Sequence, residues 1–415
     1  MSLDARLTPG ASPGLTHRAR IGAALGMLSV LAIGVATLRP TGDTIAPGWS
    51  FSLASGDEAV AEVIQNLLLF IPFGMALGAL GVRWRKLLVT GLALSFCVEF
   101  LQQWIPGRDP SVGDIVTNVA STLLGGAFVW TAPRWLDPAT RVAPWMSLGA
   151  AAVAGAAWLG TGCLLRPMLP QVVALQTLAP DLGPHWDLYS GRVLSVTGRL
   201  GAREPLRIVA VTGTPAMSRQ LAPILDVDDG PGPAGTIVAA DRSDLVLRNR
   251  SRSMFVRLAR PDLRARGGLA GVAPGDTIAI TARTDPNGGF CLGRDTTESC
   301  GLGYTFGDGW KLIFFPRHFA PWAYSVLNAM WVGGGLLGVG LWARDMRQPP
   351  NGAALLLVVA TLALGPRVVA LKPTPIGEWL GAAAGFTLGW LASRGGNRLS
   401  FLRAPPPLMT REPHG

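Results

Sequence analysis

Three apolar segments between residues 61 and 130 carry polar side chains that a lipid bilayer should exclude. Each segment contains an acid followed four residues later by a carboxamide, and positions four apart share one face of a helix. The polar residues of the three segments are Glu62, Gln65, Asn66, Glu99, Gln102, Gln103, Asp114 and Asn118. An ionisable group at the centre of a spanning helix costs at least ~2.5 kcal/mol, so such groups tend to mark function.

If the three helices alternate in direction, their polar ends meet at one face of the membrane. Arg108 lies in the short turn between the second and third segments, from which it can reach Glu99 or Asp114. Its planar guanidinium suits a phosphate or carboxylate head group. Converging acids also make Glu99 or Asp114 a candidate general base. The alternative is that these groups only join helices, but interhelical hydrogen bonds contribute only ~0.6 kcal/mol on average.

The composition is that of a membrane protein. Of the 415 residues, 49% are hydrophobic and only 15% are charged, against about 25% charged in a typical soluble protein. A spanning helix needs roughly 17 to 25 apolar residues. Eight segments fit this length: 21–38, 61–82, 86–104, 112–131, 144–165, 320–343, 352–370 and 376–393.

Basic residues cluster at alternate connections between these eight segments. They include Arg18, Arg20, Arg83, Arg85, Lys86, Arg134, Arg141, Arg344, Arg347, Arg394, Arg398 and Arg403. With eight alternating spans, all of them fall on one side, which the positive-inside rule makes cytoplasmic. The sequence therefore predicts a multi-pass protein of the cytoplasmic membrane with both termini in the cytoplasm.

Residues 166–318 interrupt the helical pattern and predict an all-β domain outside the cell. Short alternating runs such as RIVAVTG, GTIVAA, SMFVRLA, TIAITAR and GWKLIFFP are separated by turn residues, which is typical of an antiparallel sandwich. The predicted organisation is a disordered tail at 1–20, helices at 21–165, the β-sandwich at 166–318, helices at 319–393 and a second tail at 394–415.

Two further features of the β domain have chemical consequences. Cys291 and Cys300 flank a short polar loop, and in an oxidising compartment this spacing predicts a disulfide rather than a metal site. Arg248, Arg250 and Arg252 alternate, so on a strand they would form one basic face. That face is either simply solvated or contacts an anionic phospholipid or acidic polysaccharide. Nucleic acid is excluded as a partner by the predicted location.

Glycine spacing in the last helix indicates close packing and a repeat. Gly377, Gly381, Gly385 and Gly389 recur every four residues and would let two helices approach closely. Gly113-Asp114 and Gly377-Glu378 share an offset that also superposes Gly125 on Gly389. An ancestral repeat is one explanation of this echo, and it would place Glu378 at the outer face, as it does Asp114.

The polar motifs resemble those of the VanZ-like family. The likeness covers roughly residues 21–131 and rests on Gln65-Asn66 with Pro72 and Gly74, on Ser95, Glu99 and Gln102, and on Arg108, Asp114 and Asn118. The family often has a glycine just after the asparagine, where this chain has Val119. The resemblance implies a multi-pass membrane protein related to one linked to low-level teicoplanin resistance, without an established reaction. The β domain more faintly resembles a concanavalin-like or laminin-G-like jelly roll, a fold that often binds sugars.

The sequence thus predicts a membrane α-helical bundle with an inserted jelly-roll-like sandwich. Besides a structural membrane module whose only working part is the sandwich, two functions remain open. The first is binding of an anionic lipid or cell-envelope precursor head group at the outer face, with an envelope glycan as a further partner of the β domain. The second is a lipid or glycan transferase or hydrolase with Glu99 or Asp114 as general base. No cofactor is expected, since the chain lacks a phosphate-binding Gly-Lys-Ser/Thr loop and a histidine-rich metal motif.

Overall fold

A computed structural model describes most of the chain, including its helical and β parts. The described residues are 17–41, 48–51, 56–169, 175–183, 186–202, 204–214, 220–228, 235–286 and 289–394. The predicted tails lie outside these residues, apart from 17–20 and 394, which are helical. The chain divides into two compact units, which are described separately: Met1–Ser55, Val63–Pro138 and Gly395–Gly415 form the first, and Gly56–Glu62 and Ala139–Arg394 the second.

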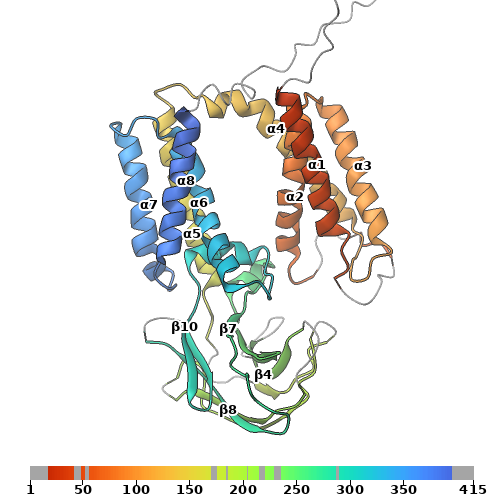
Figure 1. Ribbon diagram of the computed structural model, residues 1–415, viewed down its shortest axis with the longest axis vertical. Helices are drawn as coiled ribbons and strands as arrows, with labels where there is room; N and C mark the ends of the chain where they lie inside the picture. The colour runs from red at the N-terminus through yellow and green to blue at the C-terminus, as the bar shows by residue number, and fades with distance from the viewer. Residues whose placement is uncertain are drawn as a thin grey trace, which may run out of the picture. The chain divides into compact units, whose positions relative to one another are not determined.

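The described part of the first unit is helical (Figure 1). Its helices are α1 (His17–Thr37), α2 (Ala59–Ala79), α3 (Trp84–Gln102) and α4 (Val112–Leu136); the first four residues of α2 belong to the second unit. Ser111 caps the start of α4, because its hydroxyl accepts a hydrogen bond from the Gly113 N–H at 3.1 Å. This cap fixes where α4 begins, and therefore where Asp114 and Asn118 lie on its first two turns.

The second unit contains the other four helices and all of the strands. Its helices are α5 (Ala143–Leu165), α6 (Pro321–Trp342), α7 (Pro349–Val368) and α8 (Ile376–Arg394). Each begins and ends within a few residues of a predicted segment. Prolines stand in the first turn of α5, α6 and α7, a position where the missing N–H has no intrahelical partner.

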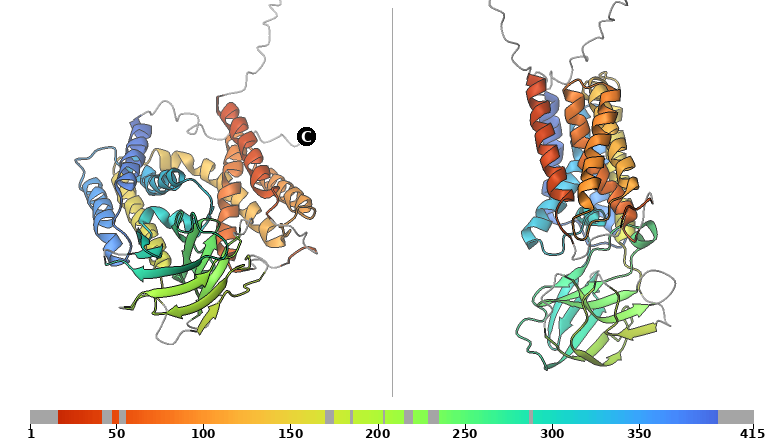
Figure 2. Two further views of the ribbon diagram at one scale, coloured as in Figure 1. Left: turned by 60° about the horizontal axis from the view of Figure 1, so that its bottom comes forward. Right: turned by 90° about the vertical axis from the view of Figure 1, so that its right-hand side faces the viewer.

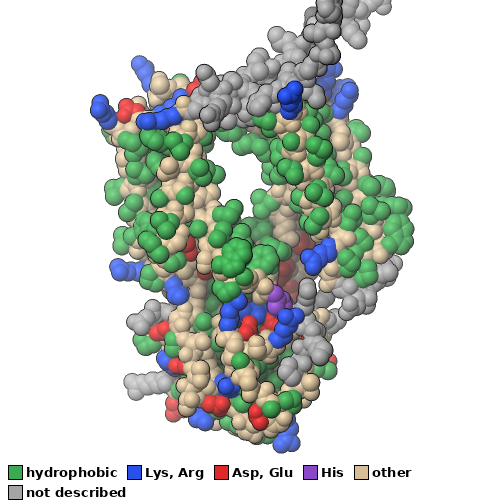
Figure 3. Space-filling view, in the orientation of Figure 1, with side chains coloured by type: hydrophobic (Ala, Val, Ile, Leu, Met, Phe, Trp, Pro, Cys, Tyr) green, Lys and Arg blue, Asp and Glu red, His purple; other side chains and the backbone are tan. Residues whose placement is uncertain are grey.

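Six of the described helices are long and apolar enough to cross a membrane: α1, α2, α4, α5, α6 and α7. The remaining two, α3 and α8, carry charged residues, among them Glu99 and Glu378. Apolar side chains cover the flanks of the helices, whereas charged side chains gather at the helix ends and over the strands (Figure 3). The predicted multi-pass membrane protein is confirmed, and eight is an approximate number of spans.

Within its described residues, the inserted domain has ten strands in two antiparallel sheets, seen as two layers in Figure 2. One sheet has the order β1-β4-β5-β6-β7: β1 (Leu175–Leu178), β4 (Ala222–Asp228), β5 (Thr236–Asp241), β6 (Asp244–Arg248) and β7 (Leu263–Ala265). The other has the order β10-β9-β8-β3-β2: β10 (Thr297–Leu302), β9 (Phe290–Arg294), β8 (Thr277–Thr284), β3 (Leu206–Val211) and β2 (Arg192–Thr197).

Both sheets contribute to one hydrophobic core. Ile208 and Ile280 from one sheet and Leu225 and Leu247 from the other are fully buried in it. The alternation that predicted these strands therefore has its expected cause, since every second side chain enters the core. The predicted β-sandwich is confirmed, while the finer likeness to a concanavalin-like jelly roll stays a prediction.

Two of the predicted strands are wrong. SMFVRLA instead starts within the 3-10 helix η1 (Arg252–Val256), and GWKLIFFP overlaps the 3-10 helix η2 (Phe306–Leu312). In η1, Met254 is buried whereas Phe255 and Val256 are exposed, so its apolar residues do not alternate between two faces as they would on a strand. A capping box between Thr305 and Asp308 fixes the start of η2.

Candidate functional site

The predicted polar residues of the first unit converge at the junction of α2, α3 and α4. The Asn66 side chain on α2 donates a hydrogen bond to the Asp114 carboxylate on α4 at 2.8 Å. Glu99, on the last turn of α3, is 2% exposed and accepts a hydrogen bond from the Ser111 N–H at 2.8 Å. Glu99 also lies within electrostatic range of both Asp114 and Arg108. Two carboxylates and one guanidinium are thus gathered at one end of these helices.

Arg108 does not form the predicted ion pair with Glu99 or Asp114. Its Nη2 donates to the Ala36 carbonyl at 2.6 Å and its Nε to the Arg39 carbonyl at 3.1 Å. The last carbonyls of a helix have no intrahelical partner, so a cation at the end of α1 is a favourable neighbour for them. Burial lowers the pKa of Arg108, and the nearby charge of Glu99 opposes this shift. The guanidinium stays charged and is held in place by backbone.

The inner side of this junction is held by amides. Gln102 is 6% exposed and donates to the Thr37 carbonyl at 3.1 Å, which joins the ends of α3 and α1. Asn118 is buried and donates to the Ser95 hydroxyl at 3.0 Å. Its Oδ1 is buried without a hydrogen-bond partner among the described residues. A buried acceptor with no partner costs stability, so an unpaired Oδ1 calls for an explanation such as a bound water or ligand.

The other three predicted site residues are less buried than Glu99, Gln102 and Asn118. Glu62 is exposed and belongs to the second unit, and Gln65 and Gln103 are half-buried. Glu99 and Asp114 come together, and the prediction that Glu62 shares their site stays a prediction. We call Asn66, Glu99, Gln102, Arg108, Asp114 and Asn118 the α2–α4 polar cluster.

Glycines allow α2 and α4 to approach closely enough for Asn66 to reach Asp114. A β-carbon on Gly125 would lie 2.2 Å from the Ile71 carbonyl oxygen, and one on Gly74 would lie 2.0 Å from that of Thr122. Both distances are far below van der Waals contact. The two helices therefore pack backbone against backbone, as small residues permit in membranes.

The second unit repeats this packing. A β-carbon on Gly389 would lie 2.1 Å from the Leu337 carbonyl oxygen, and one on Gly340 would lie 2.0 Å from that of Phe386. Gly389 and Phe386 of α8 stand 264 residues after Gly125 and Thr122 of α4, and Gly340 and Leu337 of α6 stand 266 residues after Gly74 and Ile71 of α2. The contacts of α2 with α4 thus recur, pair by pair, between α6 and α8, which supports the repeat. Gly377, the first residue of the glycine series, faces open space.

Glu378 of α8, the counterpart of Asp114 in this repeat, is already hydrogen-bonded within the chain. Glu378 is 1% exposed and accepts a hydrogen bond from the Thr305 hydroxyl. Gly307 lies so close that a β-carbon there would be 2.2 Å from a Glu378 oxygen. Neighbouring Asp308 is held by Asn328 at 2.9 Å and by Lys311 at 2.6 Å. The η2 segment therefore covers Glu378, whereas Asp114 stays half-buried, and the first unit is the better candidate for a ligand site.

Sequence reasoning missed several of these partners. Ser111 carries a signal that would have revealed it, because a serine directly before an apolar helix is a preferred N-cap. Thr305 and Asp308 fit the spacing of a capping box, yet nothing in the sequence links Thr305 to Glu378, 73 residues further on.

The basic face predicted for the β domain is wrong. β6 ends at Arg248, Arg250 follows in a loop and Arg252 starts η1, so the three do not alternate along a strand. Arg248 and Arg250 are 7% and 6% exposed. Arg248 donates to the Asp262 carboxylate at 2.6 Å and stacks 4.8 Å from the Trp186 ring.

Asp262 is the centre of a buried ion network. Besides Arg248, the guanidinium groups of Arg264 and Arg317 lie 3.4 and 3.9 Å from its oxygens. Burial alone would raise the pKa of Asp262, but these arginines together hold it below its usual value. The arginines of this region therefore neutralise buried carboxylates and hold the loops after β6 in place.

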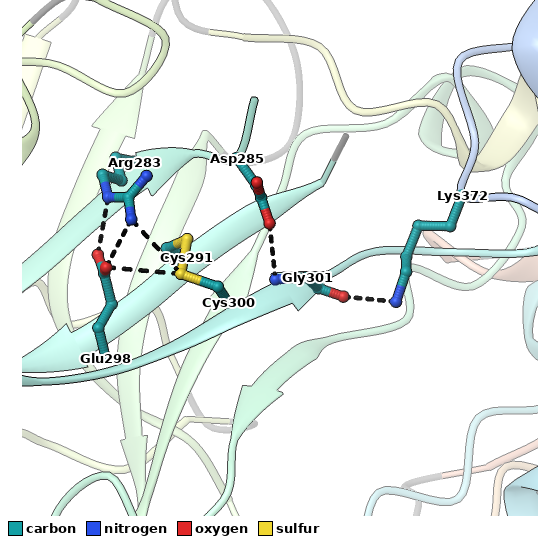
Figure 4. The surroundings of a disulfide bond; sticks show 7 residues. All are labelled: Arg283, Asp285, Cys291, Glu298, Cys300, Gly301 and Lys372. Carbon is teal, nitrogen blue, oxygen red and sulfur yellow. Dashed lines mark hydrogen bonds and ion pairs between the residues drawn. A yellow bond between two sulfur atoms is a disulfide. The ribbon is translucent and has the colours of Figure 1, made fainter. Parts of the chain in front are cut away.

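Cys291 and Cys300 form a disulfide between β9 and β10 (Figure 4). Asp285 lies close to both sulfur atoms, but two bonded cysteines have no thiolate to offer a metal. Arg283 and Glu298 form an ion pair at 2.7 Å beside the disulfide. The disulfide and this ion pair therefore stabilise the β9–β10 edge of the sheet.

Comparison with known proteins identifies only the first helices. Residues 23–133 match the VanZ/LLP1 family, a range that contains the whole α2–α4 polar cluster. No curated protein and no solved structure matches the chain significantly. This part of the chain is VanZ-like, as the polar motifs indicate.

Proposed function

We propose that this VanZ-like membrane protein binds the head group of an anionic lipid or cell-envelope precursor through the α2–α4 polar cluster. The observation that carries the proposal is the hydrogen bonding of the Arg108 guanidinium. Its Nη2 is fixed by the Ala36 carbonyl at the end of α1 and its Nε by the Arg39 carbonyl just beyond it, which leaves the hydrogens of Nη1 for a further acceptor such as a phosphate oxygen. Glu99 and Asp114 lie nearby and suit hydroxyl or amine groups of the same head group.

The basic connections support the orientation proposed with this function. In the proposed orientation both termini lie in the cytoplasm, the polar cluster lies at the outer face of a cytoplasmic membrane and the β domain lies outside the cell, as the positive-inside rule favours. In this arrangement the β domain is available to an envelope glycan. A link to teicoplanin resistance is part of the proposal and follows from the VanZ-like motifs, since glycopeptides act on envelope precursors.

Identification of the lipids that copurify with the full-length protein tests this proposal. Wild type should retain an anionic lipid or lipid-linked precursor in native mass spectra, and Glu99→Gln should change how much is retained. Arg83→Gln is the matched control, because Arg83 is exposed at the opposite end of α3. Equal retention of all lipid classes by the three proteins would refute the proposal.

A second function, hydrolysis or group transfer on a lipid or glycan, is favoured by one observation. Glu99 is buried and lies within electrostatic range of Asp114, and two neighbouring acids can divide the roles of proton acceptor and donor. Asp114→Asn should then abolish turnover while lipid retention and folding persist. Retained turnover in Asp114→Asn and in Glu99→Gln would remove the catalytic reading.

A further inference from the structure

A cavity of about 210 Å³ lies in the second unit, outside the α2–α4 polar cluster. It is bounded by the connection that follows α5, by the end of the β8–β9 hairpin and by the connection between α7 and α8. Apolar walls are supplied by Leu169, Phe290, Tyr304 and Leu371. Phe290 and Tyr304 are 4% and 5% exposed, so this side of the cavity is part of a fixed core.

Two cations, Arg166 and Lys372, also line the cavity, and its lining residues include no Asp or Glu. The Lys372 ammonium donates to the Gly301 carbonyl at 2.6 Å (Figure 4). This bond uses one of the three ammonium hydrogens. Asp285 accepts a hydrogen bond from the N–H of the same Gly301 at 3.0 Å (Figure 4). Arg166 is exposed. The cavity is therefore positive on one side and apolar on the other.

Both cations lie just beyond the C-terminal ends of helices that are long and apolar enough to cross a membrane. Arg166 directly follows the last residue of α5, and Lys372 comes four residues after the end of α7. Both helices run in the same direction if the spans alternate, so both ends lie at one face. In the orientation proposed above this is the outer face, where basic residues near helix ends are less common. Arg166 and Lys372 could be explained as cations that balance the partial negative charges at the C-terminal ends of two helices. That role does not explain why an apolar cavity lies beside them.

We propose that this cavity binds the phosphate-bearing head group of an anionic phospholipid, with Arg166 and Lys372 contacting the phosphate. The apolar walls would contact the glycerol backbone and the first methylenes of the acyl chains. Arginine can bind phosphate oxygens bidentately, and lysine acts as a point charge beside it. This site is separate from the one formed by α2, α3 and α4 and uses none of its residues.

Binding of phosphatidylglycerol to the full-length protein in detergent, measured by native mass spectrometry, tests the proposal. Arg166→Gln should weaken the proposed site about fivefold, the effect of one basic residue near an anionic surface. Arg192→Gln is the control, because Arg192 is an exposed residue of β2 that does not line the cavity. Arg108→Gln should leave phosphatidylglycerol binding at this cavity unchanged. The two proposals can therefore fail independently, because each predicts a loss of binding in a different variant.

Two further measurements keep the test decisive. Leu169→Trp retains both cations but fills the cavity, and it should reduce phosphatidylglycerol binding as strongly as Arg166→Gln. Glycerol phosphate in solution shows whether the acyl chains matter: weak binding supports a lipid, and binding as tight as that of phosphatidylglycerol supports a soluble phosphate ester at the same site. Phosphatidylglycerol binding that neither variant alters would overturn the proposal.

Discussion

Gly125→Ala should separate α2 from α4 and thereby destabilise the helices that carry the polar cluster. The added methyl group would lie 2.2 Å from the Ile71 carbonyl oxygen and 2.8 Å from the Met75 nitrogen. A carbon and an oxygen in contact are normally more than 3 Å apart, so the helices must move by about 1 Å. Overpacking of this kind costs about 1–3 kcal/mol.

The matched control is Gly34→Ala, in α1 of the same unit. Gly34 has no neighbour within 4 Å of its would-be β-carbon, and alanine favours a helix over glycine by about 1 kcal/mol. The free energy of unfolding, measured in detergent by titration with sodium dodecyl sulfate, should fall for Gly125→Ala and stay equal or rise for Gly34→Ala. Equal stability of the two variants would refute the close approach of α2 and α4.

Three other predictions concern the β domain. Asp262→Asn leaves Arg248 and its neighbours without their buried counter-charge, so thermal unfolding should show a loss of about 3–5 kcal/mol in the free energy of unfolding. Because the pKa of Asp262 is depressed in the folded state, the stability that this group contributes to the wild type is present above pH ~4 and is lost as the pH falls through the folded-state pKa. This pH dependence should vanish in the variant. Cys291→Ala with Cys300→Ala, nine residues apart, should cost about 2.5 kcal/mol in chain entropy, and reduction should not affect the double variant. Leu194→Cys, 44% exposed on β2, should react with a membrane-impermeant maleimide on intact cells, and protection until lysis would reverse the proposed topology.

The helices could be predicted from the sequence because their signal is local. Runs of apolar residues near the length of a bilayer predicted all eight helices, including α3 and α8 despite Glu99 and Glu378. The strands with a buried face, such as β3 and β8, could be predicted from their alternation. The predicted basic face is wrong because an alternating sequence pattern does not show where a strand ends. β6 ends at Arg248, so Arg250 and Arg252 lie beyond it.

The candidate site could be predicted only in part. Helical spacing placed Asp114 and Asn118 on one face of α4, and alternation of the spans brought Glu99 close to Asp114. The partners depend on contacts between distant segments that the sequence does not show. Arg108 binds the carbonyl of Ala36 in α1 and that of Arg39 just beyond it, some 70 residues earlier, and Glu62 is exposed. Residue spacing predicts which side chains share a face of a helix, but it does not predict which groups from other segments that face contacts.

The central claim is that Arg108 offers its remaining donors to an anionic head group, and the affinity of the purified protein for a short-chain phosphatidylglycerol tests it most directly. A hydrogen bond to a charged group contributes about 1.5–3 kcal/mol, so Arg108→Gln should weaken binding at the α2–α4 site at least about tenfold. Arg108→Lys should recover part of the loss, and Arg83→Gln should bind like wild type. Unchanged affinity in a folded Arg108→Gln protein, relative to the protein with Arg108 and with both carrying Leu169→Trp to fill the other proposed site, would contradict the account.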